Sequence, residues 1–599
     1  MMNRREKDAM TMKRILAAGG ALAIWAVIIV VRLVDLQVLQ HDDYCRQAVA
    51  QQEQTKVIPA ARGSIFDRHG QLLAVCRKAD TVYIAPAQVT NVYGTAAALS
   101  KALGLDRQRL IKTCRRDLDA VFVKRMVPAE EADLVRAMGL DGVGLMPEND
   151  RHYPQGELAC HVLGFTDMDN SGKYGVEQQF NEDIAGRDGQ WFVCRDALGR
   201  PYNPGARPAT AGRDLVLTID TVIQYQAERA LDEAMGKSGA RWGSVVVMDV
   251  WNGDVLAMAS RPGFDPNRYN LYNLDRMSNL AVNRIYEPGS TFKLITMAAA
   301  LEDDLLDLDR EIDCGNGRIR VGRGWINDHK PFDKLVPAEI IAKSSNVGAI
   351  QVGRIAGSRR LHEMITAFGF GRKTGIRLPW EEAGLVKPVK SWSGRTCATI
   401  SFGQEISVTP LQLCRAVAAI ASDGTLRTPR LVLQTQDREG NHVRRFKPRT
   451  EGRPISERTA SILREMMAGV VADGTGKKAA SDSYQTAGKT GTAQMIIDGA
   501  YADNRFVASF AGFAPLHLPR IAVVAVLAEV RRPHYHGGDV AAPVFREVVD
   551  GALRRLAVPA DRDEILLAGV EQPPAQPVKT TADAGGVDEE KEKAWPASL

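Results

Sequence analysis

The sequence lacks the cysteine and histidine patterns that build metal sites or disulfide scaffolds. Its eight cysteines are scattered, and neither a Cys-x-x-Cys pair nor a metal-type pairing of cysteine with histidine occurs. A zinc site or a disulfide framework is therefore not expected, although one or two bridges remain compatible with the sequence. An excess of one charge is also missing, since 77 basic residues face 72 acidic ones. This balance gives no indication of nucleic-acid binding.

No internal repeat of solenoid period is present either, which argues against a repeat architecture. The composition, 45% hydrophobic and 25% charged, is that of globular domains rather than of a disordered chain. A chain of 599 residues is long enough for more than one such domain. We therefore expect two folded units with additional terminal segments.

A long hydrophobic run lies near the N-terminus. Ile15 to Val31 carries no charge, and the run continues to Leu39 with only Arg32 and Asp35 interrupting it. At 1.5 Å per residue, a helix over the uncharged part spans about 26 Å, close to the thickness of a bilayer core. The sequence therefore predicts a transmembrane anchor over residues 15–39.

Basic residues outnumber acidic ones in residues 1–14. By the positive-inside rule this segment is a cytoplasmic tail, and the chain after the anchor lies outside the cytoplasmic membrane as a single-pass protein. The alternatives are a cleaved signal peptide and a buried core helix. No A-x-A-like cleavage site follows Val31, and the run exceeds a typical signal-peptide core, which favours an uncleaved anchor.

The rest of the chain divides into two predicted units and a tail. In residues 40–215 we expect a polar helix over 41–58, helical segments over 95–145, and loops with short strands over 151–213. Residues 216–560 show apolar strands at 243–250 and 254–260 around a Trp-Asn-Gly turn, a helix capped by Asp220 or Thr221, and a distant strand at 520–530. This pattern predicts an α+β fold with one antiparallel sheet packed against helices. Residues 561–599 are predicted to be a disordered tail.

Three short motifs carry the candidate chemistry: Ser290-Thr291-Phe292-Lys293, Ser344-Ser345-Asn346 and Lys489-Thr490-Gly491. This set in this order is typical of penicillin-binding proteins and β-lactamases. Each motif alone is a weak signal, because such short patterns occur by chance. Their joint occurrence makes Ser290 a candidate nucleophile.

The first motif follows Pro288-Gly289 and precedes an apolar run, so we expect it to form the first turn of a buried helix. Residues three apart share a helix face, so the Lys293 amine can reach the Ser290 hydroxyl and act as its base. A lysine pKa of about 10.4 must then fall by some three units. Burial together with a second cation such as Lys489 could lower it. The competing interpretation is a serine at a helix start with a solvated lysine.

The third motif is predicted to lie on a strand, with Gly491 where another group approaches the backbone closely. Its lysine and hydroxyls can bind a terminal carboxylate, whereas the alternative is a surface turn. The second motif lies between two helical stretches, and an ordinary N-cap is its competing interpretation.

These motifs resemble those of class B penicillin-binding proteins, and the resemblance covers about residues 15–550. It rests also on RGSIFDRHG (62–70), YPQGELACHVLGF (153–165), GVEQQFNEDIAGRDG (175–189), RDLVLTIDTVIQ, YEPGSTFK, FGFGRKTGI (368–376), SFGQEISVTPLQL, GTGKKA, AGKTGTAQ and ASFAGFAP (508–515). RGSIFDR and SFGQEISVTPLQL look most like the cell-division (FtsI-type) branch. The elongation branch is the alternative.

The resemblance implies a non-catalytic, dimerisation-like pedestal over 40–215 and a serine β-lactamase-like transpeptidase domain over 216–560. It implies that Ser290 attacks the penultimate D-Ala carbonyl of a peptidoglycan stem peptide and that a neighbouring stem amine resolves the acyl-enzyme into a cross-link during septal synthesis, with possible carboxypeptidase side activity. β-Lactams would be covalent inhibitors, no cofactor is needed, and division membrane proteins, including a lipid II polymerase of the SEDS type, would be partners.

The same resemblance assigns roles to individual residues. It implies Lys293 as the base, Ser344 as a proton relay, and Asn346 as the residue that orients the substrate amide. Lys489 with Thr490, in a segment that continues through Gly491 and Thr492, would hold the substrate carboxylate. The backbone amides of Ser290 and Thr492 would form the oxyanion hole.

Two other classes of protein are alternatives to a transpeptidase. A membrane-bound β-lactamase needs a base for deacylating water, usually in an ExxLN segment, and none follows the second motif. A sensing receptor or a non-catalytic division scaffold needs a signalling domain or a broken motif, whereas all three motifs are intact. His534-Tyr535-His536 without a third ligand is interpreted as a loop, not a metal site.

Overall fold

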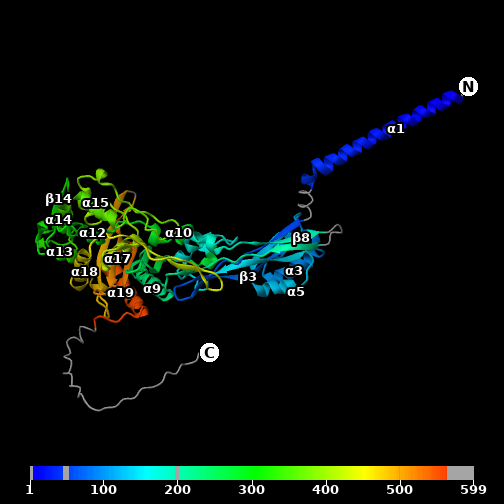
Figure 1. Ribbon diagram of the computed structural model, residues 1–599. Helices are drawn as coiled ribbons and strands as arrows, with labels where there is room; N and C mark the ends of the chain where they lie inside the picture. Colours follow the sequence, from blue (N-terminus) through cyan, green and yellow to red (C-terminus); the bar gives the residue numbers. More distant parts are fainter. Residues whose placement is uncertain (1–3, 45–52, 196–200, 498, 563–599) are drawn as a thin grey trace, which may run out of the picture.

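The computed structural model describes residues 4–44, 53–195, 201–497 and 499–562. Helix α1 (Arg4–Val34) continues into a π-helical segment, η1 (Asp35–Leu39), and extends away from the rest of the chain (Figure 1). Within it, Met12–Leu39 is long and apolar enough to cross a membrane, and its most apolar window is not buried by protein. The helix fits a single-pass membrane anchor. The predicted tail over 561–599 lies almost wholly outside the described residues.

The pedestal is built from two sheets and three longer helices. Strands β1 (Glu53–Ile58), β8 (Gly189–Arg195) and β9 (Pro201–Arg207) form one sheet, and the long β3 (Leu72–Ile84) pairs with β4 (Val121–Val127) and β5 (Val143–His152) in the other. The helices are α3 (Val92–Leu103), α4 (Arg107–Cys114) and α5 (Ala129–Ala137). Short elements fill 160–184: α6 (Cys160–Leu163), β6 (Phe165–Thr166), β7 (Gly172–Lys173), α7 (Gly175–Gln179) and α8 (Asn181–Ile184).

The polar helix predicted over 41–58 is wrong for its second part. Residues 53–58 form β1, which pairs antiparallel with β8, more than a hundred residues later in the chain. The helical state of 41–44 agrees with the prediction, and 45–52 lie outside the described residues. Strand β1 is polar, so its conformation depends on a distant partner rather than on a local pattern.

One sheet connects the pedestal with the C-terminal half. Strand β10 (Asp214–Leu217) runs parallel to β2 (Ile65–Phe66) and antiparallel to β18 (Val432–Gln436), which pairs with β19 (His442–Arg445). The order is β19-β18-β10-β2-β3-β4, with β5 also on β3. The predicted boundary between residues 215 and 216 falls inside β10, so this sheet contains strands from both sides of it.

A buried ion cluster fixes the base of the pedestal. Glu177 accepts from Arg62 Nε (2.6 Å) and Arg151 Nε (2.7 Å), and the three side chains are 0–2% exposed. Burial alone would raise the pKa of the Glu177 carboxyl, yet the two guanidiniums outweigh it and hold the pKa below its usual value. The carboxylate is therefore charged and joins three distant segments.

We expect Glu177→Ala to lower the free energy of unfolding by about 3–5 kcal/mol, because two buried guanidiniums lose their counterion. Pulse proteolysis of the detergent-solubilised chain in urea measures this. Glu311→Ala, which breaks the exposed pair with Lys334 (3.3 Å), is the control and should change little. Equal effects of the two substitutions would show that the buried cluster does not stabilise the pedestal.

The C-terminal half contains the predicted antiparallel sheet. Its order is β12 (Val255–Arg261), β11 (Trp242–Asp249), β23 (Ile521–Val530), β22 (Ala500–Ala514) and β21 (Ala487–Ile497). The predicted hairpin between β11 and β12 is confirmed, with Gly253 at φ +79°. The two edge strands of this sheet, β12 and β21, come from distant segments of the chain, as predicted.

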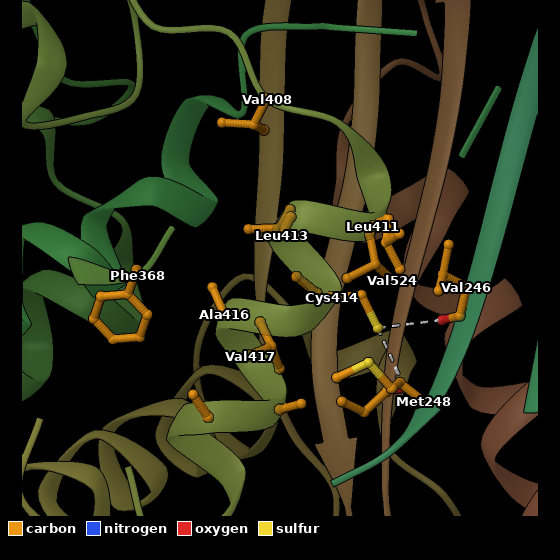
Figure 2. Packing of buried hydrophobic residues seen from close by; sticks show 14 of the residues in the cluster. Val246, Met248, Phe368, Val408, Leu411, Leu413, Cys414, Ala416, Val417 and Val524 are labelled. Atoms are coloured by element: carbon orange, nitrogen blue, oxygen red, sulfur yellow. Dashed lines mark hydrogen bonds between the residues drawn. The ribbon is translucent and has the colours of Figure 1, made fainter. Parts of the chain in front are cut away.

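Both faces of this sheet are buried. Successive side chains of β11 and β23 point to opposite faces of the sheet. On one face they pack against α9 (Thr221–Ser238) and α19 (Gly537–Arg555), and on the other against α17 (Pro410–Ala421). Figure 2 shows Leu411, Cys414 and Val417 of α17 facing Val246 and Val524. Asp220 caps α9 by accepting from the amides of residues 222 and 223, which decides between the two predicted caps.

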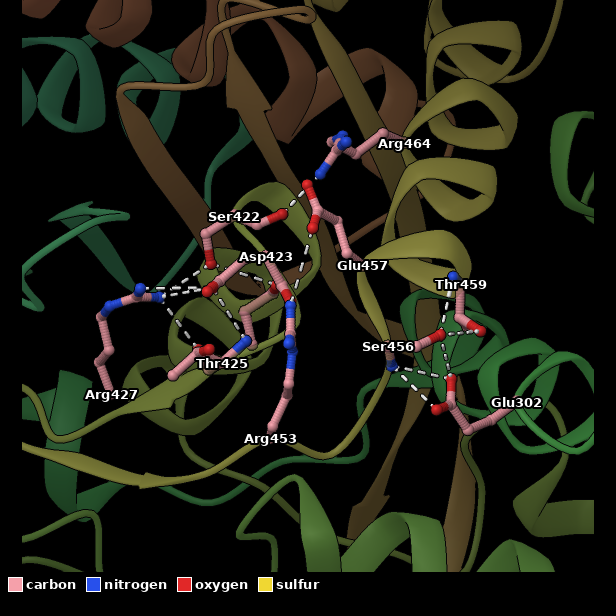
Figure 3. A network of polar contacts seen from close by, with 11 residues as sticks. Glu302, Ser422, Asp423, Thr425, Arg427, Arg453, Ser456, Glu457, Thr459 and Arg464 are labelled. Atoms are coloured by element: carbon pink, nitrogen blue, oxygen red, sulfur yellow. Dashed lines mark hydrogen bonds and ion pairs between the residues drawn. The ribbon is translucent and has the colours of Figure 1, made fainter.

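The helix after the first motif, α12 (Lys293–Leu301), is wholly buried. Glu302, directly after α12, accepts from the Ser456 amide (2.9 Å) and hydroxyl (3.0 Å), and Ser456 caps α18 (Glu457–Ala472) (Figure 3). The end of α12 is thus bound to the start of α18.

The C-terminal half contains further helices and short strands. The other helices are α10 (Leu274–Met277), α11 (Leu280–Asn283), α13 (Pro337–Lys343), α14 (Asn346–Ala356), α15 (Ser358–Ala367) and α16 (Thr396–Ile400). The short strands are β13 (Ile312–Asp313), β14 (Arg318–Val321), β15 (Gly324–Asn327), β16 (Lys334–Leu335), β17 (Leu426–Arg427) and β20 (Thr450–Gly452).

Candidate active site

Ser290 lies in a short 3-10 turn, η4 (Gly289–Phe292), that passes directly into α12. The expected first helical turn is therefore tighter than an α-helix. Gly289 has φ +55° and donates its amide to the Gly403 carbonyl (3.1 Å), which fixes the entry to the turn. Ser290 is half-buried and lines a cavity of about 570 Å³.

The first two motifs meet at the Lys293 amine. Lys293 Nζ donates to the Ser344 carbonyl (2.6 Å), Ser344 Oγ (3.2 Å) and Asn346 Oδ1 (2.9 Å). Ser344 adopts φ +59° between α13 and α14. Among the described residues Lys293 makes no hydrogen bond to Ser290. Such contacts often form only when substrate is bound.

The third motif approaches from β21. Lys489 Nζ donates to Ser344 Oγ (2.9 Å), so this hydroxyl lies between two buried amines. The Thr490 hydroxyl shares a hydrogen bond with Thr475 (2.6 Å), and Thr492 Oγ1 accepts from the amide of Gly537 at the start of α19 (3.0 Å). The structure thus brings the three motifs together. One cavity is lined by Ser290, Ser344, Asn346, Thr490 and Thr492, and the two buried lysine amines bind the Ser344 hydroxyl.

Gly491 marks a close approach of backbone segments. A Cβ at this position would lie 2.3 Å from Ser509 Oγ and 2.9 Å from the Pro288 carbonyl oxygen. The hydroxyl belongs to the paired strand β22, and the carbonyl belongs to the segment just before Ser290. Glycine at 491 thus lets β21 lie against the turn that carries Ser290.

Burial lowers the pKa of the Lys293 amine from 10.5 to about 7, against the opposing effect of the Asp328 carboxylate. Burial, and then the charge of Lys293, lowers the pKa of Lys489 well below its ordinary value. The uncharged form of Lys293 is therefore accessible near pH 7, unlike that of a solvent-exposed lysine. Burial, which the sequence argument named, is thus the cause of the lowered pKa of Lys293, whereas the charge of Lys489 does not contribute to it.

Asp328 is a residue that the sequence argument missed. It accepts from the Ser345 hydroxyl (2.6 Å), from the Asn346 amide and from the Val347 amide (3.1 Å). These contacts fix the start of α14 and hence Asn346. Its sequence position, before His329, carries no motif that would have identified it.

Other cavity residues were also not predicted. They include His329, Lys330, Phe402, Gln404, Thr475, Lys477, Lys478, His536 and Asp539. His536, expected in an ordinary loop, directly precedes α19 and lines the cavity. No group of three or more potential metal ligands occurs in the part of the chain that the structure describes. The lysines on the cavity wall favour an anionic ligand.

Comparison with family models decides the relationship. The model described as the penicillin binding protein transpeptidase domain matches residues 243–550, and that of the penicillin-binding protein dimerisation domain matches residues 57–217. The chain belongs to the penicillin-binding protein family. The resemblance inferred from the motifs is confirmed, as is the fold with a pedestal and a transpeptidase domain.

Relatives of this penicillin-binding protein cover most of its length. Stage V sporulation protein D of Bacillus subtilis is 35% identical over 84% of this chain and 80% of the relative. Peptidoglycan D,D-transpeptidase FtsI of Escherichia coli is 31% identical over 90% and 92%. The crystal structure of penicillin-binding protein 3 from Mycobacterium tuberculosis complexed with aztreonam has a TM-score of 0.66 and 30% identity, covering 84% of this chain and 98% of that one.

We expect Asp328→Asn to shift the pH dependence of acylation. The Asp328 charge raises the Lys293 pKa, so its removal lowers that pKa, and the rising limb of the acylation rate moves from near pH 7 to lower pH. Stopped-flow acylation by a fluorescent penicillin measures this. Asp333→Asn, at an exposed carboxylate, is the control. An unchanged limb in Asp328→Asn would contradict the coupling.

Proposed function

We propose that this protein is a peptidoglycan D,D-transpeptidase that cross-links stem peptides through a Ser290 acyl-enzyme and is acylated by β-lactams. The observation that carries the proposal is the Ser344 hydroxyl held between the Lys293 and Lys489 amines, in the wall of the cavity that the half-buried Ser290 also lines. The relatives named as peptidoglycan D,D-transpeptidases support it.

The first step is acylation. Uncharged Lys293 takes the proton from Ser290 Oγ as this oxygen attacks the penultimate D-Ala carbonyl carbon. The backbone amides of Ser290 and Thr492 stabilise the oxyanion. The bond to the terminal D-Ala nitrogen then breaks, and this nitrogen receives a proton from Lys293 through the Ser344 hydroxyl. The hydrogen-bonded path from Lys293 Nζ to Ser344 Oγ supports this route.

The second step transfers the acyl group. The amine of a neighbouring stem attacks the ester carbonyl, gives one proton to Lys293, and forms the cross-linking amide. The Ser290 oxygen leaves and recovers that proton, so the enzyme returns to its starting state. No cofactor takes part in either step.

Substrate binding involves the third motif. The terminal carboxylate binds Lys489 with Thr490, and Asn346 orients the substrate amide. An anion near Lys489 stabilises its charged form, so substrate restores a pKa that burial has lowered in the free enzyme. In this proposal Lys489 is therefore charged when the substrate carboxylate is bound.

We also propose a septal role, with the elongation branch as the alternative. The FtsI relative and the segments RGSIFDR and SFGQEISVTPLQL support septal synthesis. In this proposal residues 1–14 lie in the cytoplasm and the catalytic domain lies outside the membrane. Division membrane proteins, including a lipid II polymerase of the SEDS type, are the partners.

We expect Ser290→Ala to abolish covalent labelling by a fluorescent penicillin, since the acylated oxygen is removed. Lys293→Ala should slow labelling by about 10²–10⁴-fold because the base is lost. Gel fluorescence of the purified full chain measures both. Ser391→Ala, at an exposed serine, should label normally. Covalent labelling of Ser290→Ala would refute the nucleophile assignment.

Depletion of the protein from its native cell should give filaments, because septal synthesis stops while elongation continues. Microscopy after depletion measures this, and rounded cells would instead support elongation. Re-expression of the wild-type chain should restore division, whereas Ser290→Ala should not. Restoration by Ser290→Ala would favour the non-catalytic scaffold.

A further inference from the structure

A second cavity, of about 270 Å³, opens where the pedestal meets the C-terminal half. Its wall includes Phe180 of the pedestal and residues from 375–377, 428–432 and 444–449. Five of its cations are exposed: Arg377, Arg444, Arg445, Lys447 and Arg449. We call these five residues together with Phe446 the basic cleft.

The charge of the basic cleft is not balanced by carboxylates among the residues that the structure describes. Arg430, a sixth cation in the wall, pairs with the buried Asp254. In the described ranges no carboxylate forms an ion pair with any of the five exposed cations. Many other exposed cations of this chain do have such partners, for example Arg458 with Asp304 (2.8 Å). A concentration of unpaired guanidiniums beside a cavity attracts anions and suits carboxylates in particular.

The cleft is organised around an aromatic ring. Phe446 is half-buried, lies edge-on to Phe180 (6.0 Å between ring centroids), and is flanked by the guanidiniums of Arg444 (4.7 Å) and Arg377 (5.3 Å). Its carbonyl accepts from Arg430 Nη1 (2.6 Å). These contacts hold two of the cations in place beside the cavity, so less side-chain freedom is lost when an anion binds them.

The cleft also lies at a sheet edge. Strand β19 (His442–Arg445) is the terminal strand of the seven-stranded sheet, and within the described part of the chain it pairs only with β18. An edge strand presents unpaired backbone groups that an extended peptide can bind as an added strand. The arginines of this edge repel basic strands and favour acidic ones.

The distribution of charge favours an extended ligand over a single small anion. Residues 444–449 carry four of the cations, and at about 3.3 Å per residue this stretch extends for nearly 20 Å if fully extended. One phosphate or carboxylate could contact only part of it. A chain with repeated acidic side chains could contact the whole row.

We propose that β19 and the basic cleft bind an extended acidic segment of another protein, which adds as a strand beside β19 and places carboxylates on Arg444 and Arg377 beside Phe446. Because β18 and β10 link β19 to the pedestal strands β2 and β3, the bound segment extends a sheet shared by both halves. The partner is a protein with an acidic, strand-forming segment exposed on the same side of the membrane.

Fluorescence anisotropy with the detergent-solubilised full chain tests this, using a fluorescein-labelled peptide of alternating Glu and Thr. We expect salt-sensitive binding that Arg444→Glu with Arg445→Glu weakens by about tenfold or more. Arg107→Glu with Arg109→Glu, at exposed arginines of α4, is the matched control and should bind as the wild type does. Labelling by fluorescent penicillin should be normal in both variants, which shows that each is folded.

Two further probes separate strand addition from simple charge attraction. The same peptide with alternate backbone nitrogens methylated keeps its charge but cannot pair fully with β19, so it should bind more weakly. Polyphosphate and vesicles of anionic lipid should bind more weakly than the peptide, or should bind the Arg444→Glu, Arg445→Glu variant (the cleft variant) as tightly as they bind the wild type. The proposal would be overturned if the peptide did not bind, or if it bound the cleft variant as tightly as the wild type. It would also be overturned if the methylated peptide bound as tightly as the unmodified one. Finally, it would be overturned if polyphosphate or the vesicles bound as tightly as the peptide and lost this binding in the cleft variant.

Discussion

The site depends on one constraint: two buried lysine amines share the Ser344 hydroxyl. Lys293 Nζ lies 3.2 Å and Lys489 Nζ 2.9 Å from Ser344 Oγ, with both side chains at most 1% exposed. Two ammonium groups so placed repel each other and lack water to solvate them, so their charged forms are disfavoured. The same burial therefore favours an uncharged Lys293, as its proposed role as a base requires, and leaves Lys489 an amine whose charged form a nearby anion would stabilise.

The surrounding structure maintains this arrangement. Asp328 holds the start of α14, and Gly491 allows β21 to lie against the turn that carries Ser290. Strand β21 is an edge of a sheet whose inner strands are buried on both faces, and α12 is bound to α18 through Glu302. Each proposed catalytic group thus lies on an element fixed by packing, which limits the reorganisation that the proposed reaction needs.

The sheet shared by the two halves connects these observations with the basic cleft. The Arg62–Glu177–Arg151 cluster fixes the pedestal segments next to β2, while β18 and β19 extend from the C-terminal half to the same sheet. A partner strand on β19 would therefore contact a structure continuous with both domains. In such an arrangement binding at the cleft and the position of the pedestal are physically linked.

The sequence by itself determined features that depend on local patterns. The apolar helix, the hairpin at Gly253, the α+β class and the three motifs follow from hydrophobic periodicity, turn chemistry and residue spacing. Only the tertiary structure decided that 53–58 form a strand, that Asp328 holds the second motif, that Lys293 contacts Ser344 rather than Ser290, and that β19 ends a sheet shared by both halves. The physical reason is that these features depend on contacts between segments far apart in the chain, and a single sequence carries no local signal of which distant segments will pair.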